Sequence, residues 1–239
     1  MDWFSDSNAY LPFKMMSASH ITALLVFSIG CYAIYKNRDG LRLIDNRLAE
    51  LSAAAVLILF EAAYHIWLWQ SGFWKASESI PAELCSISLF LSILLLLTGR
   101  KVFYEWLFFT ALLGATQALL TPVLYIDFPH FRFVHFFFTH MMMIWTALYY
   151  TWVKGWKPTG KSILKTFVFL NLLLPGVIYL NKATGGNYMF LSRKPETASL
   201  LDYLGPHPLY ILSLEALFLA FSVLLWLVFR SRTPEKEHG

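Results

Sequence analysis

Charged side chains are scarce in this chain. Only 14% of its 239 residues are Asp, Glu, Lys or Arg, whereas 57% are hydrophobic and 18% are aromatic. A soluble domain of this length would need a charged surface. Here the charged residues stand mostly in short connections between apolar stretches that are long enough to cross a bilayer. The scarcity excludes an ordinary soluble domain and predicts a multi-pass helical protein of the cell membrane.

The chain also lacks a basic leader, a separate basic domain and an internal repeat. Asp2 and Asp6 precede the first apolar run, and no small-residue cleavage signal follows it, so we expect that run to remain as a helix. The net charge of +4 comes from basic residues in loops beside the membrane ends. Membrane lipids are therefore the expected partners, and nucleic acid is not. The two halves share no matching helix breaks, which disfavours a duplicated transporter.

Apolar runs are what the sequence has in abundance. Each of seven runs is close to the roughly 20 residues that cross a bilayer, which predicts an all-α transmembrane bundle in a single domain. The predicted spans are 17–35, 50–70, 82–98, 103–124, 132–153, 164–181 and 208–229. The segment 182–207 between the last two is rich in Gly, Asn and Pro but also holds apolar residues, so it predicts an outer cap that rests on the bundle.

The distribution of basic residues predicts the orientation of these spans. With the N-terminus outside, 13 of the 19 Lys and Arg residues fall in the inner connections and the C-terminal tail. These are Lys36, Arg38, Arg42, Arg47, Arg100, Lys101, Lys154, Lys157, Lys161, Lys165, Arg230, Arg232 and Lys236. Because cytoplasmic loops carry the excess of positive charge, the N-terminus is predicted outside and the C-terminus inside.

This orientation places polar side chains from several spans at one outer level. They are His20, Glu61, His65, Glu83, Cys85, Gln117, His135, His140 and His207. Ionisable groups inside a membrane are costly and commonly mark a functional site. Glu61 and His65 are four residues apart and share a helix face. His135 and His140 lie roughly 140° apart around a helix, so one chemical and one structural histidine are expected.

Cysteine is nearly absent. Cys31 falls near the inner end of the first span and Cys85 near the outer end of the third, so a disulfide between them is excluded. We therefore expect Cys85 to be a free thiol, which a nearby histidine could convert into a nucleophilic thiolate. Taken alone, a buried cysteine or histidine is more often a packing or hydrogen-bonding residue. The shared depth of the polar groups is what favours a site.

The sequence resembles the bacterial YwaF family of integral membrane proteins over nearly its whole length. The resemblance rests on Asn187-Tyr188-Met189-Phe190-Leu191, Lys194-Pro195, Leu200-Leu201-Asp202, Leu204-Gly205-Pro206, Pro208-Leu209-Tyr210, Glu83-Leu84-Cys85 and the aromatic run 130–140. That family is similar to a vertebrate transmembrane family with an acyltransferase that remodels ether phospholipids, and more remotely to membrane hydrolases of hydroxy-fatty-acid esters. The resemblance places this chain in the bacterial plasma membrane.

The resemblance also implies a nucleophile and a histidine inside the bundle. The cysteine of the family motif matches Cys85, and the histidine that follows the aromatic run best matches His140, with His135 as the alternative counterpart. The chain departs from the family pattern at Glu83, where many relatives carry histidine. A carboxylate there disfavours the Cys85 thiolate unless Glu83 pairs with a histidine or with Arg132.

Three functions remain open on these residues. In the first, Cys85 forms an acyl-enzyme, His140 is the base, and Gln117, Asn187 or Tyr188 binds the oxyanion, with a lysophospholipid or water as acceptor and no cofactor. In the second, Zn²⁺ bound by members of the set His20, His65, His135, His140 and His207 activates water, although no compact zinc motif is present. In the third, the polar groups only form interhelical hydrogen bonds in a lipid-binding or transport bundle.

Overall fold

The described part of the chain is built from helices. The structure is a computed structural model and describes residue 4, residues 12–194 and residues 200–230. Asp2, Asp6, Pro195, Arg232 and Lys236 lie outside this part. Within it there is no β-strand, only an isolated bridge between Pro12 and Ile126.

The described residues form seven helices of 15 residues or more, which confirms the predicted number. They are α1 (Ala18–Arg42), α2 (Arg47–Gln70), α3 (Leu84–Thr98), the continuous helix formed by α4 (Lys101–Thr110), η1 (Ala111–Ala115) and α5 (Thr116–Leu120), then α6 (Phe131–Trp152), α7 (Gly160–Thr184) and α8 (Leu209–Phe229). Two short 3₁₀ turns, η2 (Tyr188–Phe190) and η3 (Leu200–Tyr203), lie between α7 and α8. The bounds agree with the predicted spans to within a few residues, except that α1 continues to Arg42 instead of ending at 35.

Five of the seven helices are long and apolar enough to cross a membrane: α1, α2, the continuous helix Lys101–Leu120, α7 and α8. The third helix has only 15 residues, a length of roughly 22 Å. It ends at Gly99, whose φ of +62° closes the helix in a left-handed conformation that glycine adopts without strain. The remaining helix, α6, has 22 residues and is rich in aromatic and polar side chains.

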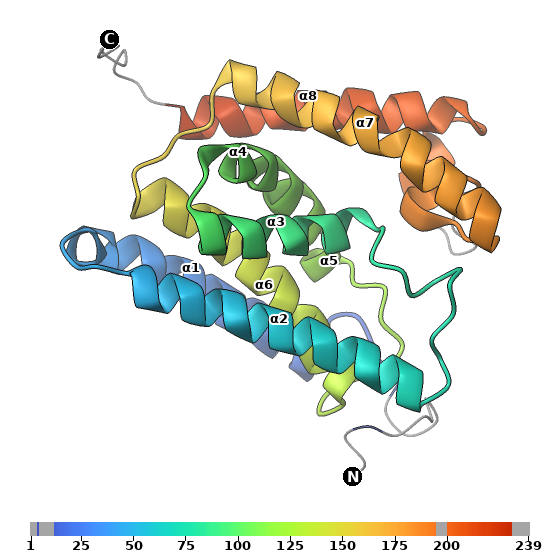
Figure 1. The fold of residues 1–239 in the computed structure, drawn as a ribbon, viewed down its shortest axis with the longest axis horizontal. Helices are drawn as coiled ribbons and strands as arrows, with labels where there is room; N and C mark the ends of the chain where they lie inside the picture. The colour runs from blue at the N-terminus through green and yellow to red at the C-terminus, as the bar shows by residue number, and fades with distance from the viewer. Residues whose placement is uncertain (1–3, 5–11, 195–199, 231–239) are drawn as a thin grey trace.

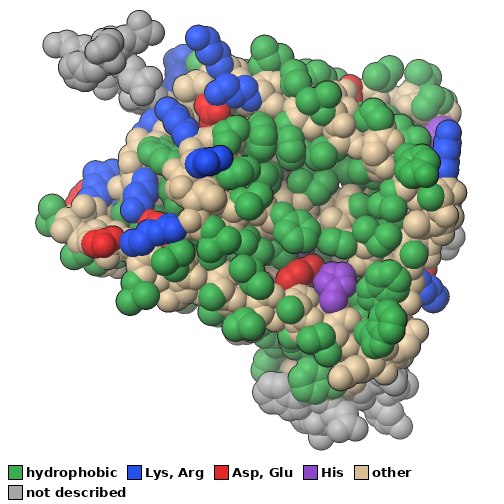
Figure 2. Space-filling model, in the orientation of Figure 1, with side chains coloured by type: hydrophobic (Ala, Val, Ile, Leu, Met, Phe, Trp, Pro, Cys, Tyr) green, Lys and Arg blue, Asp and Glu red, His purple; other side chains and the backbone are tan. Residues whose placement is uncertain are grey.

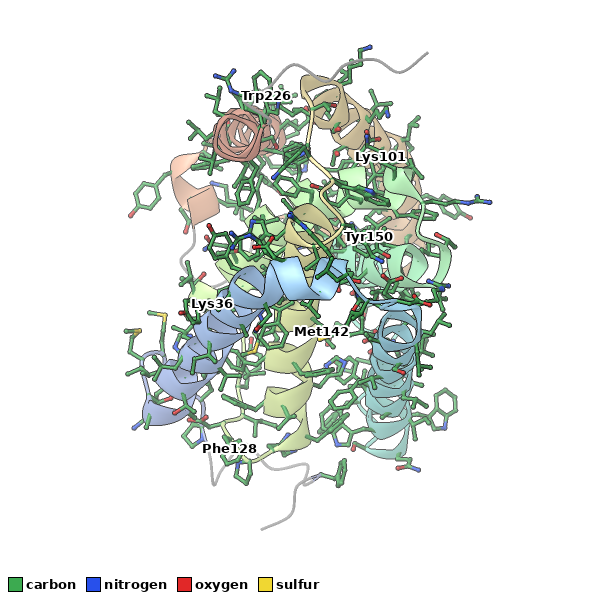
Figure 3. The ribbon with its side chains drawn as sticks, turned by 90° about the vertical axis from the view of Figure 1, so that its left-hand side faces the viewer. Lys36, Lys101, Phe128, Met142, Tyr150 and Trp226 are labelled. Carbon is green, nitrogen blue, oxygen red and sulfur yellow. The ribbon has the colours of Figure 1, made fainter. Side chains whose placement is uncertain are left out.

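The helices form three layers (Figure 1). One layer is α1 with α2, and the opposite layer is α7 with α8. Between them lie α3 and the helix that begins with α4, and α6 runs from this middle layer to a position between α1 and α2. Figure 3 looks at the molecule from one end and shows Met142 of α6 between α1 and α2, with Trp226 of α8 at the far edge. The middle layer therefore receives packing from both sides.

Helix α6 is the centre of the bundle. Fourteen of its 22 residues are buried, whereas α1 and α8 each bury two, among them His20 and Ser222. The outer helices instead expose many Leu, Ile and Val side chains, and Figure 2 shows a largely hydrophobic face between the charged ends. An apolar exterior suits lipid contact, since lipid chains are as apolar as these side chains. The polar and aromatic composition of α6 follows from its interior position.

One end of the bundle, which we call the basic end, gathers the Lys and Arg side chains (left in Figure 2). There Arg42 Nη2 donates to the carbonyl oxygen of Trp152 at 2.6 Å, and Arg47 Nη1 donates to that of Leu96 at 2.7 Å. The C-terminal carbonyl groups of a helix have no partner within the helix and carry partial negative charge. Two arginines at the α1–α2 turn therefore cap α6 and α3.

Candidate functional site

The polar cluster that joins α2 to α6 lies toward the end opposite the basic end. His135 Nε2 lies 3.1 Å from Glu61 Oε2, and His65 Nε2 lies 3.4 Å from Glu61 Oε1. Arg132, one helical turn before His135, places Nη1 3.5 Å from His135 Nδ1. The i, i+4 spacing of Glu61 and His65 and the i, i+3 spacing of Arg132 and His135 bring these side chains to facing surfaces of the two helices.

Two aromatic rings that the sequence had not singled out complete this cluster. The Tyr64 ring stacks on the His135 ring with centroids 4.4 Å apart and planes 18° apart. The Arg132 guanidinium carbon lies 4.7 Å from the Tyr64 ring centroid and 5.6 Å from that of Phe136. A signal for Tyr64 was present in the sequence, because it lies three residues after Glu61 and so shares its helix face.

His140 lies deeper along α6 and has a different partner. Its Nδ1 is 2.7 Å from the carbonyl oxygen of Phe136, and its ring centroid lies 4.3 Å from the Phe136 ring. A carbonyl oxygen can only accept, so Nδ1 carries the proton and the lone pair lies on Nε2. His140 is buried. The structure thus separates the two histidines of α6 into different surroundings.

Cys85 is the second residue of α3 and is half-buried against the core. Like Cys31, it is a free thiol. Within the described residues, no hydrogen bond joins its sulfur to a histidine. The helix that carries it, α3, packs on α6. Glu83 directs Oε2 to the backbone N–H of Met189 at 2.9 Å instead of to a histidine or Arg132.

A π-helical segment, η1, interrupts the fourth long helix beside α3 and α6. It was not predicted. A Cβ atom added to Gly114 of η1 would lie 3.5 Å from the Leu84 side chain, so the π-helical backbone approaches the residue directly before Cys85. Single π-helical turns inside longer helices are frequent at functional sites. The glycine within Ala111–Ala115 was the only local signal of it in the sequence.

The segment between α7 and α8 contacts the start of α3 and the connection before it, and Tyr188 and Met189 make these contacts. Tyr188 is buried, and its hydroxyl donates to the Ala76 carbonyl at 2.8 Å and accepts from the Ile80 N–H at 2.9 Å. Asn187 Oδ1 accepts from the backbone N–H groups of Ser192 and Arg193. Both polar side chains are therefore engaged in positioning this segment, which we call the cap.

Backbone conformation in the cap is unusual. Met189 and Phe190 both have left-handed φ values, +55° and +53°. Non-glycine residues in this region cost roughly 1 kcal/mol or more each and persist only where the surroundings hold them. Here the Glu83 carboxylate binds the Met189 N–H, and the Tyr210 hydroxyl donates to the Phe190 carbonyl. Beside them is an open cavity of about 250 Å³ lined by Glu83, Tyr188, Phe190 and neighbouring residues.

The remaining candidate residues lie apart from these groups. His20 is fully buried, with Nδ1 accepting from the Met16 N–H at 3.0 Å and Nε2 at 2.9 Å from the Leu119 carbonyl. His207 Nε2 lies 3.2 Å from the Leu191 carbonyl. Gln117 is exposed and donates to the Thr121 hydroxyl at 2.7 Å.

These positions also test whether the histidines could hold a metal ion. His65 and His135 share Glu61, whereas both ring nitrogens of His20 already have backbone partners. The described residues contain no group of three or more His, Cys, Asp and Glu side chains arranged to hold a metal ion.

The fold and its polar interior define a multi-pass membrane protein made of a helical bundle. A model of the TMEM164 family matches residues 15–226, and the chain belongs to that family. No curated protein and no solved structure matches the chain.

Proposed function

We propose that this protein is an intramembrane acyltransferase or lipid-ester hydrolase that uses Cys85 as nucleophile and His140 as base. The observation that carries the proposal is the contact of His140 Nδ1 with the Phe136 carbonyl, which leaves the Nε2 lone pair available in a buried position on the central helix. A base needs such a lone pair, and the backbone contact fixes the tautomer.

The first half-reaction forms an acyl-cysteine. His140 Nε2 takes the proton of the Cys85 thiol as the sulfur attacks the carbonyl carbon of a lipid ester or an acyl thioester. The bond from that carbon to the leaving oxygen or sulfur then breaks, and the leaving group receives the proton from His140. A thiol suits this step because its thiolate is strongly nucleophilic.

The second half-reaction regenerates the thiol. His140 takes a proton from the acceptor, either a lysophospholipid hydroxyl or water, whose oxygen attacks the acyl-cysteine carbonyl. The carbon–sulfur bond breaks, and Cys85 recovers its proton from His140. Gln117, Asn187 and Tyr188 stay the candidate oxyanion donors. Gln117 and Asn187 each have one amide proton beyond the bonds to the Thr121 hydroxyl and the Arg193 carbonyl, whereas the Tyr188 hydroxyl donates to the Ala76 carbonyl.

The orientation and the narrower family placement belong to the same proposal. The gathering of Lys and Arg at the basic end supports a cytoplasmic position for that end, with the N-terminus outside and the cap over the outer leaflet. The motifs Glu83-Leu84-Cys85 and Asn187-Tyr188-Met189-Phe190-Leu191 support a place in the bacterial YwaF group and in a bacterial plasma membrane.

A non-catalytic role is the second candidate, and one observation favours it. The Glu61–His135 contact is an interhelical hydrogen bond of the kind that holds membrane bundles together. In that reading Cys85 packs and His140 only satisfies its backbone neighbour. A zinc hydrolase stays the third proposal, although the histidines do not assemble a three-ligand set in the described residues.

Acyl transfer to Cys85 gives a direct test. Purified wild-type protein in detergent is incubated with a radiolabelled acyl donor or an activity-directed thiol probe, with Cys85→Ser as the blank and Cys31→Ser as the matched cysteine control. Labelling should require Cys85, survive in Cys31→Ser and fall about 10²-fold or more in rate in His140→Ala. Equal labelling of wild type and Cys85→Ser would overturn the thiol mechanism. Stoichiometric zinc in the purified protein, together with activity that a chelator abolishes, would instead support the zinc hydrolase.

A further inference from the structure

Arg132 lies in a slot between α2 and α6 that is formed by the rings of Tyr64 and Phe136. Its guanidinium lies between the rings of Tyr64 and Phe136, at 4.7 and 5.6 Å from their centroids. Arginine stacked on aromatic faces keeps its planar fork of N–H donors in a fixed direction. The side chain is half-buried, so the fork is held by protein but is reachable from outside.

Within the described part of the chain, Arg132 lacks the carbonyl and carboxylate partners that Arg42 and Arg47 have. Arg42 and Arg47 donate to helix carbonyl groups at the basic end. Among the described residues, no carboxylate oxygen lies within 4.0 Å of the Arg132 side-chain nitrogens, and its one side-chain hydrogen-bond contact is with His135 Nδ1. Glu61, the acid of this cluster, directs its two oxygens to His135 and His65 instead. Most of the N–H donors of Arg132 are therefore available to a ligand.

An anion is the ligand that this arrangement fits. An arginine fork matches the oxygen geometry of phosphate and binds it with two parallel hydrogen bonds. The slot lies at the start of α6, about two helical turns before His140, and belongs to the polar cluster of Glu61, His65 and His135. A phosphate bound there would hold the glycerol esters of a lipid beside the candidate chemical residues.

We propose that Arg132 binds the phosphate of a phospholipid substrate, with Tyr64 and Phe136 fixing the guanidinium and His65 beside the bound headgroup. The inference rests on the proposed function, because it assigns the substrate class of the same site. A headgroup phosphate and free inorganic phosphate share this chemistry, and the experiment below separates them.

The test measures binding without turnover, in a Cys85→Ser background purified in detergent. Thermal unfolding is followed against increasing concentrations of a lysophospholipid, a monoacylglycerol with the same acyl chain, and inorganic phosphate. A ligand that binds only the folded protein raises the unfolding temperature with its concentration. We expect tighter apparent binding of the lysophospholipid than of the monoacylglycerol, and little effect of inorganic phosphate below millimolar concentrations.

Three variants in this background assign the preference to Arg132. Arg132→Gln should weaken lysophospholipid binding roughly ten- to hundredfold and leave monoacylglycerol binding unchanged. Arg132→Lys should fall between, since lysine keeps the charge without the fork. Lys75→Gln, which removes an exposed positive charge between α2 and α3, should bind like the parent.

Two results would overturn the inference. One is equal binding of the lysophospholipid and the monoacylglycerol by the parent protein, which decides the matter even if an Arg132 variant fails to fold. The other is a shift that inorganic phosphate reproduces in full at the same concentrations, which would make the slot an anion site without lipid specificity. If wild-type protein shows no acylation of Cys85 while the Cys85→Ser protein still binds the lysophospholipid more tightly than the monoacylglycerol, only the proposed chemistry is refuted. The failure of the inference and the failure of the proposed function are therefore distinguishable.

Discussion

Glu61 Oε2 and His135 Nε2 lie 3.1 Å apart and join the second helix to the central one. The other carboxylate oxygen of Glu61, Oε1, lies 3.4 Å from His65 Nε2. Glu61 thus forms a bridge between His135 and His65. A carboxylate in a spanning helix is costly unless such partners satisfy it. Glu61 therefore stabilises the α2–α6 pairing and orients His135 with its Nε2 proton toward the acid and its Nδ1 lone pair toward Arg132.

We expect a Glu61→Leu substitution to weaken this pairing. It removes the acceptor of His135 and leaves a buried N–H without a partner, at a cost of about 1 kcal/mol or somewhat more. Glu215→Leu on α8 is the matched control, since Glu215 has no ion-pair partner in the part of the chain that the structure describes. Thermal unfolding in detergent measures both. A decrease as large for Glu215→Leu as for Glu61→Leu would contradict the role assigned to the bridge.

Two glycines of α1 differ sharply in their surroundings and give a second prediction. A Cβ atom at Gly30 would lie 2.2 Å from Cζ2 of the Trp145 ring, whereas at Gly40 it would meet nothing within 4 Å. Gly30 thus lets Trp145 of the central helix pack against α1, and Trp145 Nε1 donates to the Phe27 carbonyl there. Any side chain at position 30 must displace that ring.

Gly30→Ala should therefore lower the free energy of unfolding by about 1–3 kcal/mol, as overpacking does in other cores. Gly40→Ala should be neutral or stabilising by a few tenths of a kcal/mol, because alanine is the better helix former. The comparison uses the same substitution in the same helix, with unfolding in detergent as the measurement. Equal stability of the two variants would show that the Trp145 contact is not tight in the folded protein.

The helices could be predicted from the sequence because each span is a long apolar run with polar connections, and hydrophobicity alone fixes such a pattern. The pairing of Glu61 with His65 was also readable, since it depends on local helical spacing. The Arg132 slot between Tyr64 and Phe136 was not, because it depends on which face of α2 meets α6. The π-helical turn at Ala111–Ala115 was not predicted either, because a single glycine, Gly114, was the only local signal of it.

The same limit applies to the cap. Its position between the last two helices followed from composition, yet Asn187 and Tyr188 were expected as candidates for an oxyanion site. Their side chains instead bind backbone groups of the cap and of the α2–α3 connection. No local pattern in the sequence records these backbone contacts, because they depend on how the cap folds onto the α2–α3 connection.

Tyr188→Phe tests how the cap is attached. The change removes the hydroxyl that joins the Ala76 carbonyl and the Ile80 N–H and leaves both without this partner, which costs roughly 1–3 kcal/mol. Hydrogen exchange of residues 76–80 and 187–191 should become faster. Tyr179→Phe is the control, because Tyr179 is 75% exposed on α7. Unchanged exchange in Tyr188→Phe would mean that the cap is held by its apolar contacts instead.

Glu83 links the cap to the start of α3 and should make this link depend on pH. Burial raises the pKa of the Glu83 carboxyl above its ordinary value, with the Met189 N–H opposing the change. Between the ordinary and the raised pKa, the folded protein holds a proton that the unfolded chain has released. Stability is therefore highest below this window and falls as pH rises through it.

Glu83→Gln should remove that decrease while keeping an oxygen that accepts from the Met189 N–H. The measurement is the unfolding temperature from about pH 4 to about pH 8 in wild type and variant, where wild type should lose stability relative to Glu83→Gln as the carboxyl ionises. Glu78→Gln serves as the control for a nearby acid of the same connection. If the two curves stay parallel across the range, Glu83 does not titrate within it, and the cap is attached to the helix of Cys85 by a bond that pH does not change.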